Sequence, residues 1–135
     1  MSQFFSTDRG DEYAPYFLRS IGLSAHYLVD PSGVVIQMRS TGAGAYHAKG
    51  HNTDTIGIEF LVKGLHTYES FLYALKTNYV GDTQLKAGTD LCQMLNNQYG
   101  NLPITRHDVI DPSRKYDPGE GFPWEEFMNK IQCWN

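Results

Sequence analysis

The chain has 135 residues, of which 41% are hydrophobic and 13% aromatic, enough material for one domain over residues 1–135 with a core of its own. Lys and Arg number 11 and Asp and Glu number 15, which gives a net charge of −4. This balance argues against a nucleic-acid-binding module, because such modules carry a concentrated basic patch. Two cysteines are too few for a disulfide scaffold.

The start of the chain and its apolar runs bear on localisation. No apolar run approaches the roughly 18 residues that a membrane helix needs. The first five residues lack both the basic start and the long apolar stretch of a secretory signal. We therefore expect a protein that is cytoplasmic when synthesised and that binds no membrane and no nucleic acid.

The first predicted elements are a short helix and a hairpin. Residues 11–22 carry aromatic and aliphatic side chains at spacings of three and four, which predicts a short helix that ends at a glycine. Two β-rich runs, 24–30 and 34–38, flank an Asp-Pro-Ser-Gly turn, so they predict a hairpin. The Gly-rich stretch 40–53 is predicted to be an irregular loop.

A buried strand and two helices are predicted next. Residues 55–62 are apolar apart from Glu59, which is typical of a buried strand, and residues 68–79 and 83–99 have helical periodicity, with Gly100 as a stop. The expected buried stripe of the second helix consists of Leu85, Leu91, Met94 and Leu95, with Cys92 as a core thiol.

A polar loop and a last helix complete the chain. The loop runs from 106 to 121, and residues 123–131 predict a helix that begins at a proline. The order of strands and helices predicts an α/β fold with a central mixed β-sheet flanked by helices.

The densest polar cluster is 106–119, where a histidine, a lysine and three aspartates share a loop stiffened by two prolines. His107 offers an imidazole and Asp117 a carboxylate, a ligand combination used by catalytic zinc. The alternative is a solvated charged loop whose aspartates form turns.

Glu59 is the second candidate, because a carboxylate inside an apolar strand needs either water or a polar cavity. Alternation places Glu59 with Gly57 and Leu61, opposite Ile58 and Phe60. If the sheet is covered on both faces, Glu59 is partly desolvated and its pKa is raised, which suits proton transfer. Otherwise it is an exposed strand glutamate.

The remaining histidines carry weaker signals. His47 and His51 have the four-residue spacing of zinc-binding helices, but the glycines around them favour a loop pair that lines a cleft. His26, within a predicted strand, is expected to be a structural histidine, and His66 a surface residue.

Six strings, in order, resemble one family. They cover residues 24–35, 45–48, 52–59, 105–108, 114–119 and 122–124. Together they resemble the zinc-dependent N-acetylmuramoyl-L-alanine amidases, which are related to peptidoglycan recognition proteins and phage lysozyme-type amidases. The resemblance runs from about residue 23 to 127.

This resemblance implies a central mixed sheet with a zinc cleft on one side. It implies hydrolysis of the amide between N-acetylmuramic acid and L-alanine in peptidoglycan or muropeptides. His107 and Asp117 correspond to two zinc ligands, Glu59 to the glutamate that assists the attacking water, and Lys115 to the residue that stabilises the oxyanion. The substrate-binding wall of the cleft would contain Tyr46 and His47.

The family's first zinc ligand has no counterpart in this sequence. That ligand is a histidine at the end of an apolar first strand, whereas the first histidine here is His26. Three explanations stay open: a start just downstream of the ligand, a genuine loss, or replacement by His47 or His51. A missing first strand would also expose a sheet edge, which favours self-association.

Two functions therefore follow from the sequence. The first is zinc-dependent amidase activity, and the alternative is a catalytically impaired module that binds muropeptide without turnover. Retention of Glu59, His107, Lys115 and Asp117 favours a working site, because decayed enzymes usually lose several such residues. Cell-wall recycling, a phage lysin that acts after lysis, and specialised export are all compatible settings.

Overall fold

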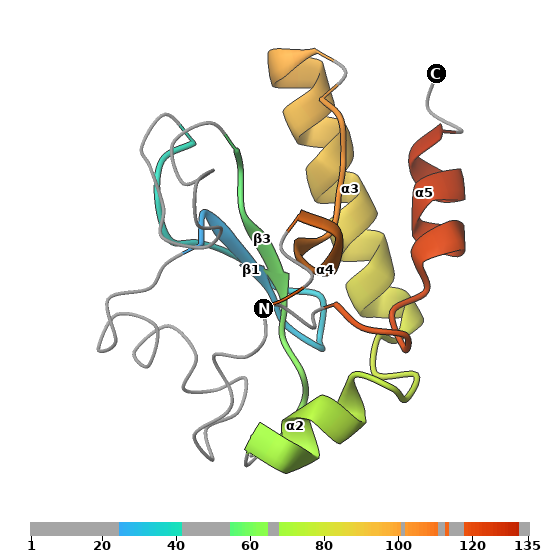
Figure 1. Cartoon of the computed structure of the whole chain (residues 1–135). Coiled ribbons are helices and arrows are strands. Elements are labelled where there is room, and N and C mark those ends of the chain that lie inside the picture. The colour runs from blue at the N-terminus through green and yellow to red at the C-terminus, as the bar shows by residue number, and fades with distance from the viewer. Residues whose placement is uncertain are drawn as a thin grey trace.

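The structure is a computed structural model, shown in Figure 1, and it describes residues 25–41, 55–64, 68–100, 102–110, 113 and 118–132. The elements in chain order are β1 (Tyr27–Val29), β2 (Val35–Gln37), β3 (Ile58–Phe60), α2 (Tyr68–Ala74), α3 (Asp82–Tyr99), α4 (His107–Ile110) and α5 (Trp124–Gln132). The predicted helix at 11–22 and the Gly-rich loop at 42–53 lie outside the described residues.

The hairpin β1–β2 forms around Asp30. Its Oδ1 accepts hydrogen bonds from the backbone N–H groups of Ser32, at 3.0 Å, and of Val34, at 2.8 Å. Gly33 adopts a φ of 90°, in the left-handed region that glycine enters at low cost. The hairpin predicted from the Asp-Pro-Ser-Gly turn is confirmed.

The described strands form one mixed sheet in the order β2-β1-β3. β1 pairs with β2 in antiparallel fashion and with β3 in parallel fashion. The register places Leu28 opposite Ile36 on one side and opposite Glu59 on the other, so these three side chains share one face of the sheet. The predicted α/β class with a central mixed sheet is confirmed.

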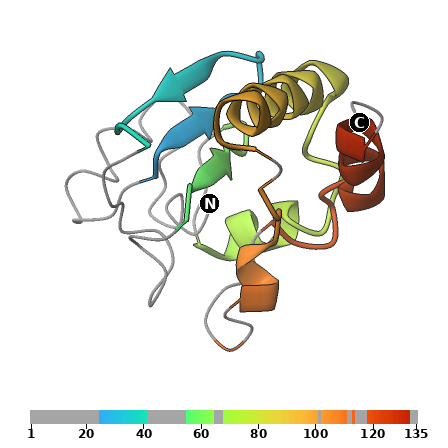
Figure 2. The ribbon, with the colours of Figure 1, turned by 90° about the horizontal axis from the view of Figure 1, so that it is seen from above.

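Helices cover both faces of this sheet, as Figure 2 shows. Tyr27 and Val29 of β1 pack with Leu91 and Leu95 of α3 on one face. On the opposite face, α2 joins a second cluster, whose buried members are Ala25, Leu28, Leu61, Val62, Phe71 and Leu75. A side chain of β3 is therefore covered whichever way it points.

Gln84, on the first turns of α3, ties that helix to the sheet. It is fully buried, and its Nε2 donates hydrogen bonds to the carbonyl oxygens of Val29, at 3.0 Å, and Leu61, at 2.9 Å. These carbonyls lie at the ends of β1 and β3, so one side chain fixes both strands against the helix.

The helix predicted at residues 83–99 is confirmed as α3, and it stops at Gly100 as predicted. Gly100 has a φ of 85°, and its N–H donates to the carbonyl of Asn96 at 2.8 Å. The prediction that Met94 belongs to the buried stripe is wrong, because its side chain is 46% exposed. Met94 and Val35 both line an open groove on this side of α3.

Helix α2 is shorter than predicted, ending at Ala74 instead of at residue 79. The N–H of Thr77 and its hydroxyl both donate to the carbonyl of Ala74, and the N–H of Lys76 donates to Tyr73. These bonds span three residues and tighten the last turn, which ends the helix.

The region predicted as a polar loop contains the short helix α4, whose last N–H groups, of Val109 and Ile110, donate to the carbonyl of Arg106. Helix α5 follows Pro123 as predicted. Within the described ranges, no helix combines the length and the apolar character needed to cross a bilayer.

Candidate functional site

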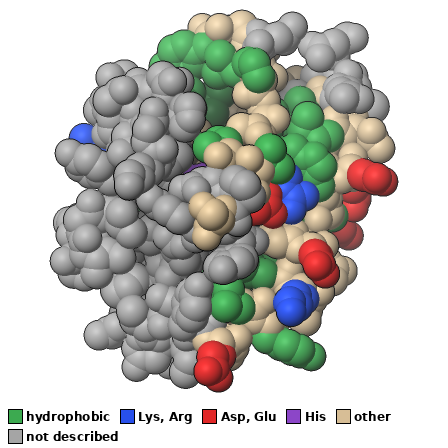
Figure 3. All heavy atoms as spheres, in the orientation of Figure 1, with side chains coloured by type: hydrophobic (Ala, Val, Ile, Leu, Met, Phe, Trp, Pro, Cys, Tyr) green, Lys and Arg blue, Asp and Glu red, His purple; other side chains and the backbone are tan. Residues whose placement is uncertain are grey.

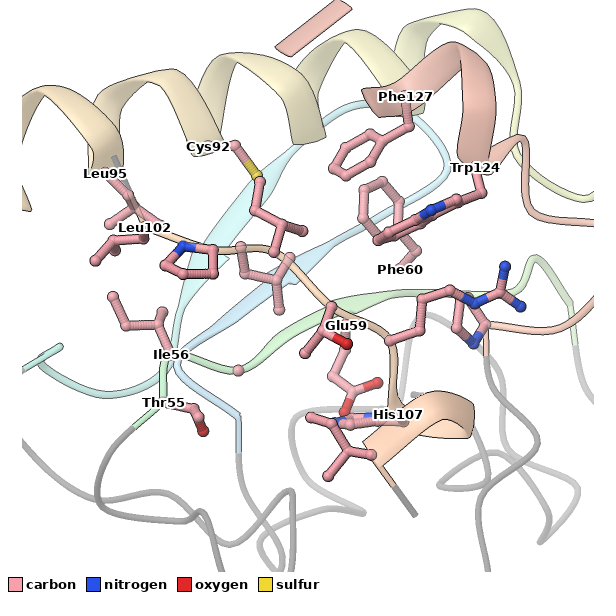
Figure 4. Close-up of a pocket in the computed structure, with 18 of the residues that line it drawn as sticks. Thr55, Ile56, Glu59, Phe60, Cys92, Leu95, Leu102, His107, Trp124 and Phe127 are labelled. Carbon is pink, nitrogen blue, oxygen red and sulfur yellow. The ribbon is translucent and has the colours of Figure 1, made fainter. Parts of the chain in front are cut away.

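A cavity of about 750 Å³ opens between β3, α3, α5 and the segment that leads into α4 (Figure 4). Its apolar wall includes Ile56, Cys92, Leu95 and Leu102. Figure 3 shows this side of the molecule, where hydrophobic side chains border a hollow and the visible Lys and Arg side chains are scattered. Polar side chains, among them Glu59, Arg106 and His107, also line the cavity and could orient a ligand.

Glu59 lines this cavity and is only 1% exposed. It shares a face with buried Gly57 and Leu61, whereas Ile58 and Phe60 pack toward α3 and α5. The alternation predicted from the sequence is confirmed, and the alternative of an exposed strand glutamate is wrong. A carboxylate this deeply buried beside a cavity is a candidate for a functional group.

His107 begins α4, is partly buried, and lines the same cavity. Figure 4 shows Glu59 and His107 at the same end of the cavity. Arg106 and Asp108 beside it are also only about one-fifth exposed, with side-chain values of 22% and 23%. This part of the polar segment is not the solvated charged loop that the sequence left as an alternative.

Lys115, Asp117, Tyr46 and His47 lie outside the described residues, as do His51 and His66. Pro118, which follows Asp117 in the chain, lines the cavity with Glu59 and His107. Among the residues that the structure describes, no group of three His, Cys, Asp or Glu side chains could hold a metal.

His26 has the structural role predicted for it. It is fully buried, and its Nδ1 accepts a hydrogen bond from the N–H of Gly57 at 3.0 Å. Its own N–H donates to the carbonyl of Gly57. His26 therefore holds Gly57 in place. Gly57 directly precedes β3 and lies two residues before Glu59.

Aromatic side chains hold the far end of β3 in place. The ring of Phe60 meets Phe122 and Phe127 edge to face, with centroids 5.0 and 5.9 Å apart. A Cβ at Gly88 of α3 would lie 2.2 Å from the same ring, so only glycine lets the helix approach so closely. The strand that carries Glu59 is thus rigidly packed.

Arg106 is a functional candidate that the sequence did not reveal. Its Nε and Nη2 donate to both carboxylate oxygens of Asp108, at 2.8 and 2.6 Å, and its guanidinium lies 5.5 Å from the ring centroid of Trp124. The hydrogen bonds that Arg106 donates to Asp108 raise the pKa of its guanidinium further above the usual value, so Arg106 is a permanent cation. An Arg two residues before an Asp carries no recognisable sequence signal.

Cys92 is buried in the wall of the cavity, and burial raises the pKa of its thiol to about 12. At pH 8 only about one thiol in 10⁴ would be a thiolate, the reactive form. The prediction of a core thiol is confirmed, and nucleophilic catalysis by Cys92 is disfavoured.

We expect a Cys133→Ser variant, which keeps Cys92, to react with iodoacetamide at pH 8 about 10³-fold more slowly when folded than in urea. Mass spectrometry of samples taken at timed intervals measures the rate at which Cys92 is alkylated. The free energy of unfolding should also fall as the pH rises above about 9, because the unfolded thiol loses its proton there while the folded one keeps it. Equal alkylation rates in both states would contradict the burial of Cys92.

Comparisons with known proteins agree with this architecture. The sequence profile of a family described as N-acetylmuramoyl-L-alanine amidase matches residues 3–120. The chain is 28% identical to N-acetylmuramoyl-L-alanine amidase A of Achromobacter lyticus, an alignment that covers 83% of this chain and 70% of that protein. It is 25% identical to the 1,6-anhydro-N-acetylmuramyl-L-alanine amidase AmpD of Haemophilus influenzae. That alignment covers 98% of this chain and 72% of AmpD.

A solved structure resembles the chain as well. The N-acetylmuramoyl-L-alanine amidase LysC from Clostridium intestinale superimposes with a TM-score of 0.64 at 25% identity. The superposition covers 83% of this chain and 65% of LysC. The chain therefore spans slightly less than two thirds of that structure.

Proposed function

Since the chain belongs to the N-acetylmuramoyl-L-alanine amidase family, we propose that it hydrolyses the amide bond between N-acetylmuramic acid and L-alanine in peptidoglycan or muropeptides. The observation that carries the proposal is that the buried Glu59 lines the same cavity as His107. A carboxylate can serve as the general base that activates water for amide hydrolysis, and an imidazole can bind a metal ion that polarises the carbonyl.

Glu59 is proposed to take a proton from the attacking water and to pass it to the leaving amine. Its place on β3 suits this role, because the strand is fixed by His26 at one end and by the aromatic rings around Phe60 at the other. Fixed geometry matters, since a catalytic base acts only within hydrogen-bond reach of the proton.

His107 and Asp117 are proposed to hold a zinc ion. Imidazole and carboxylate are suitable donors, and the wall of the cavity contains His107 and Pro118, the neighbour of Asp117. When bound, zinc supplies a Lewis acid that polarises the scissile carbonyl and makes water easier to deprotonate. Lys115 is proposed to stabilise negative charge on the carbonyl oxygen, and Tyr46 and His47 to contact the substrate.

The test is the release of new L-alanine amino termini from purified peptidoglycan and from a soluble muropeptide. We expect release by the zinc-loaded protein, loss of release after treatment with a chelator, and recovery when zinc is returned. Binding of the muropeptide with no release under any of these conditions would favour the binding module. Release that is indifferent to the chelator would contradict the zinc site but not the amidase.

A further inference from the structure

One edge of β3 opens onto the cavity. The carbonyl of Gly57 accepts a hydrogen bond from β1 at 3.1 Å, and the N–H of Leu61 donates one to β1 at 2.9 Å. Because backbone groups alternate in direction along a strand, those of Ile58 and Phe60 point away from β1. Both residues line the cavity, and within the described part of the chain no hydrogen bond uses these outward groups.

The segment 102–105 forms another wall of the same cavity (Figure 4). It belongs to no helix or strand. Among its backbone groups, the N–H of Leu102 donates to Oδ1 of Asn96 at 3.2 Å, and no other hydrogen bond is made within the described ranges. Two stretches of backbone with unused donors and acceptors thus border one space, which we call the slot.

The size of the slot fits a short strand. Neighbouring strands lie about 4.8 Å apart, packed layers about 10 Å apart, and the rise is about 3.3 Å per residue, so a strand fills roughly 160 Å³ per residue. The cavity of about 750 Å³ therefore holds about four or five residues of extended chain. This length is comparable with that of β3 and of the segment 102–105.

The lining indicates which side chains such a strand would carry. Toward α3 and α5 the lining is apolar and includes Leu95 and Phe127. The other face of β3 carries the carboxylate of Glu59, and the positive charge of Arg106 is matched by Asp108 at 2.6 Å. The described charges at the slot are thus negative in balance, as is the whole chain at −4. Since neighbours in a sheet share faces, apolar side chains should alternate with basic ones.

We propose that the slot binds an extended segment of a partner protein, which joins the sheet as a strand beside β3. The segment has four or five residues, with apolar side chains toward α3 and basic side chains on the face of Glu59. Hydrogen bonds to the backbone of Ile58 and Phe60 supply affinity, and the alternating side chains supply selectivity. The inference goes beyond the proposed function and depends neither on zinc nor on amidase activity.

The test is amide hydrogen exchange of the full chain, followed by NMR, with and without the synthetic peptide acetyl-Val-Lys-Val-Lys-Val-amide. We expect the N–H groups of Ile58 and Phe60 to exchange quickly in the free protein and at least about 10-fold more slowly at saturating peptide. The N–H of Leu61, which already donates to Val29, is the internal control and should change much less.

Two control peptides separate the contributions. The same peptide with every backbone nitrogen methylated keeps its side chains but loses its N–H donors, and it should give no protection. A peptide with glutamates in place of the lysines should bind about 10-fold more weakly, because like charges oppose each other at the slot.

Four results would overturn the inference. Slow exchange of Ile58 and Phe60 in the free protein would mean that the chain itself covers this edge, and protection that grows with protein concentration would indicate a second copy. Protection by a muropeptide stem peptide but not by the valine–lysine peptide would assign the slot to the substrate. Binding without protection, or no binding at millimolar peptide, would exclude strand addition.

Discussion

Replacing Glu59 with glutamine should lower the rate of L-alanine release from muropeptide by about 10²- to 10⁴-fold, the usual contribution of a general acid or base. Glutamine has nearly the same shape as glutamate but cannot accept a proton at neutral pH. Because the substitution changes the chemistry and not the size, KM should change much less than kcat. Steady-state kinetics on a soluble muropeptide separate the two constants.

The fold of Glu59→Gln should survive, because the variant replaces a carboxylate that is 1% exposed with a neutral group that is less costly to bury. We expect the melting temperature to stay within a few degrees of that of the wild-type protein. Glu125→Gln, an exposed glutamate in the first turn of α5, is the control and should keep full activity. A folded Glu59→Gln protein that retains more than about a tenth of the wild-type kcat would exclude Glu59 as the proton acceptor.

The parts of the fold that were predictable are those decided by neighbouring residues. The hairpin depends on Asp30 and Gly33 within a single turn, and α3 depends on periodicity and a glycine stop. Alternation in an apolar run predicted the face on which Glu59 lies, but it left open whether that face is covered. The resemblance to the amidase family is confirmed by the profile match over residues 3–120.

The parts that could not be predicted depend on residues far apart in the chain. Gln84 bonds to Val29, which is 55 positions away, and nothing in the local sequence distinguishes it from a surface glutamine. Met94 belongs to the same apolar stripe as the buried Leu91 and Leu95, and periodicity alone did not distinguish its exposed side chain from theirs. The hydrogen bonds of Tyr79 and Arg106 to the carbonyls of Pro118 and Gly119 form only when three distant segments meet.

Several sequence predictions stay predictions. They concern the single domain over 1–135, the absent first strand with its zinc ligand, self-association through a sheet edge, and cytoplasmic synthesis. The roles of Lys115, Asp117, Tyr46 and His47 belong with them, because these residues lie outside the described part of the structure.

Replacing His107 with alanine should weaken zinc binding by more than about 100-fold, because loss of a direct ligand costs more than loss of a group behind one. His107 is partly buried at the start of α4, and the helix keeps its bonds to the carbonyl of Arg106 in the variant. The metal-free protein should therefore remain folded. Chelator competition measures the affinity, and thermal unfolding of the metal-free protein measures the fold.

The contrasting variant is His26→Leu, in the other histidine that the structure describes. It leaves the buried N–H of Gly57 without the Nδ1 acceptor, so it should lower the free energy of unfolding by about 1–3 kcal/mol without a matching loss of zinc affinity. The two histidines then separate cleanly: one variant loses metal and keeps stability, and the other loses stability and keeps metal. Unchanged zinc binding in His107→Ala would refute its assignment as a ligand and would move the metal site away from α4.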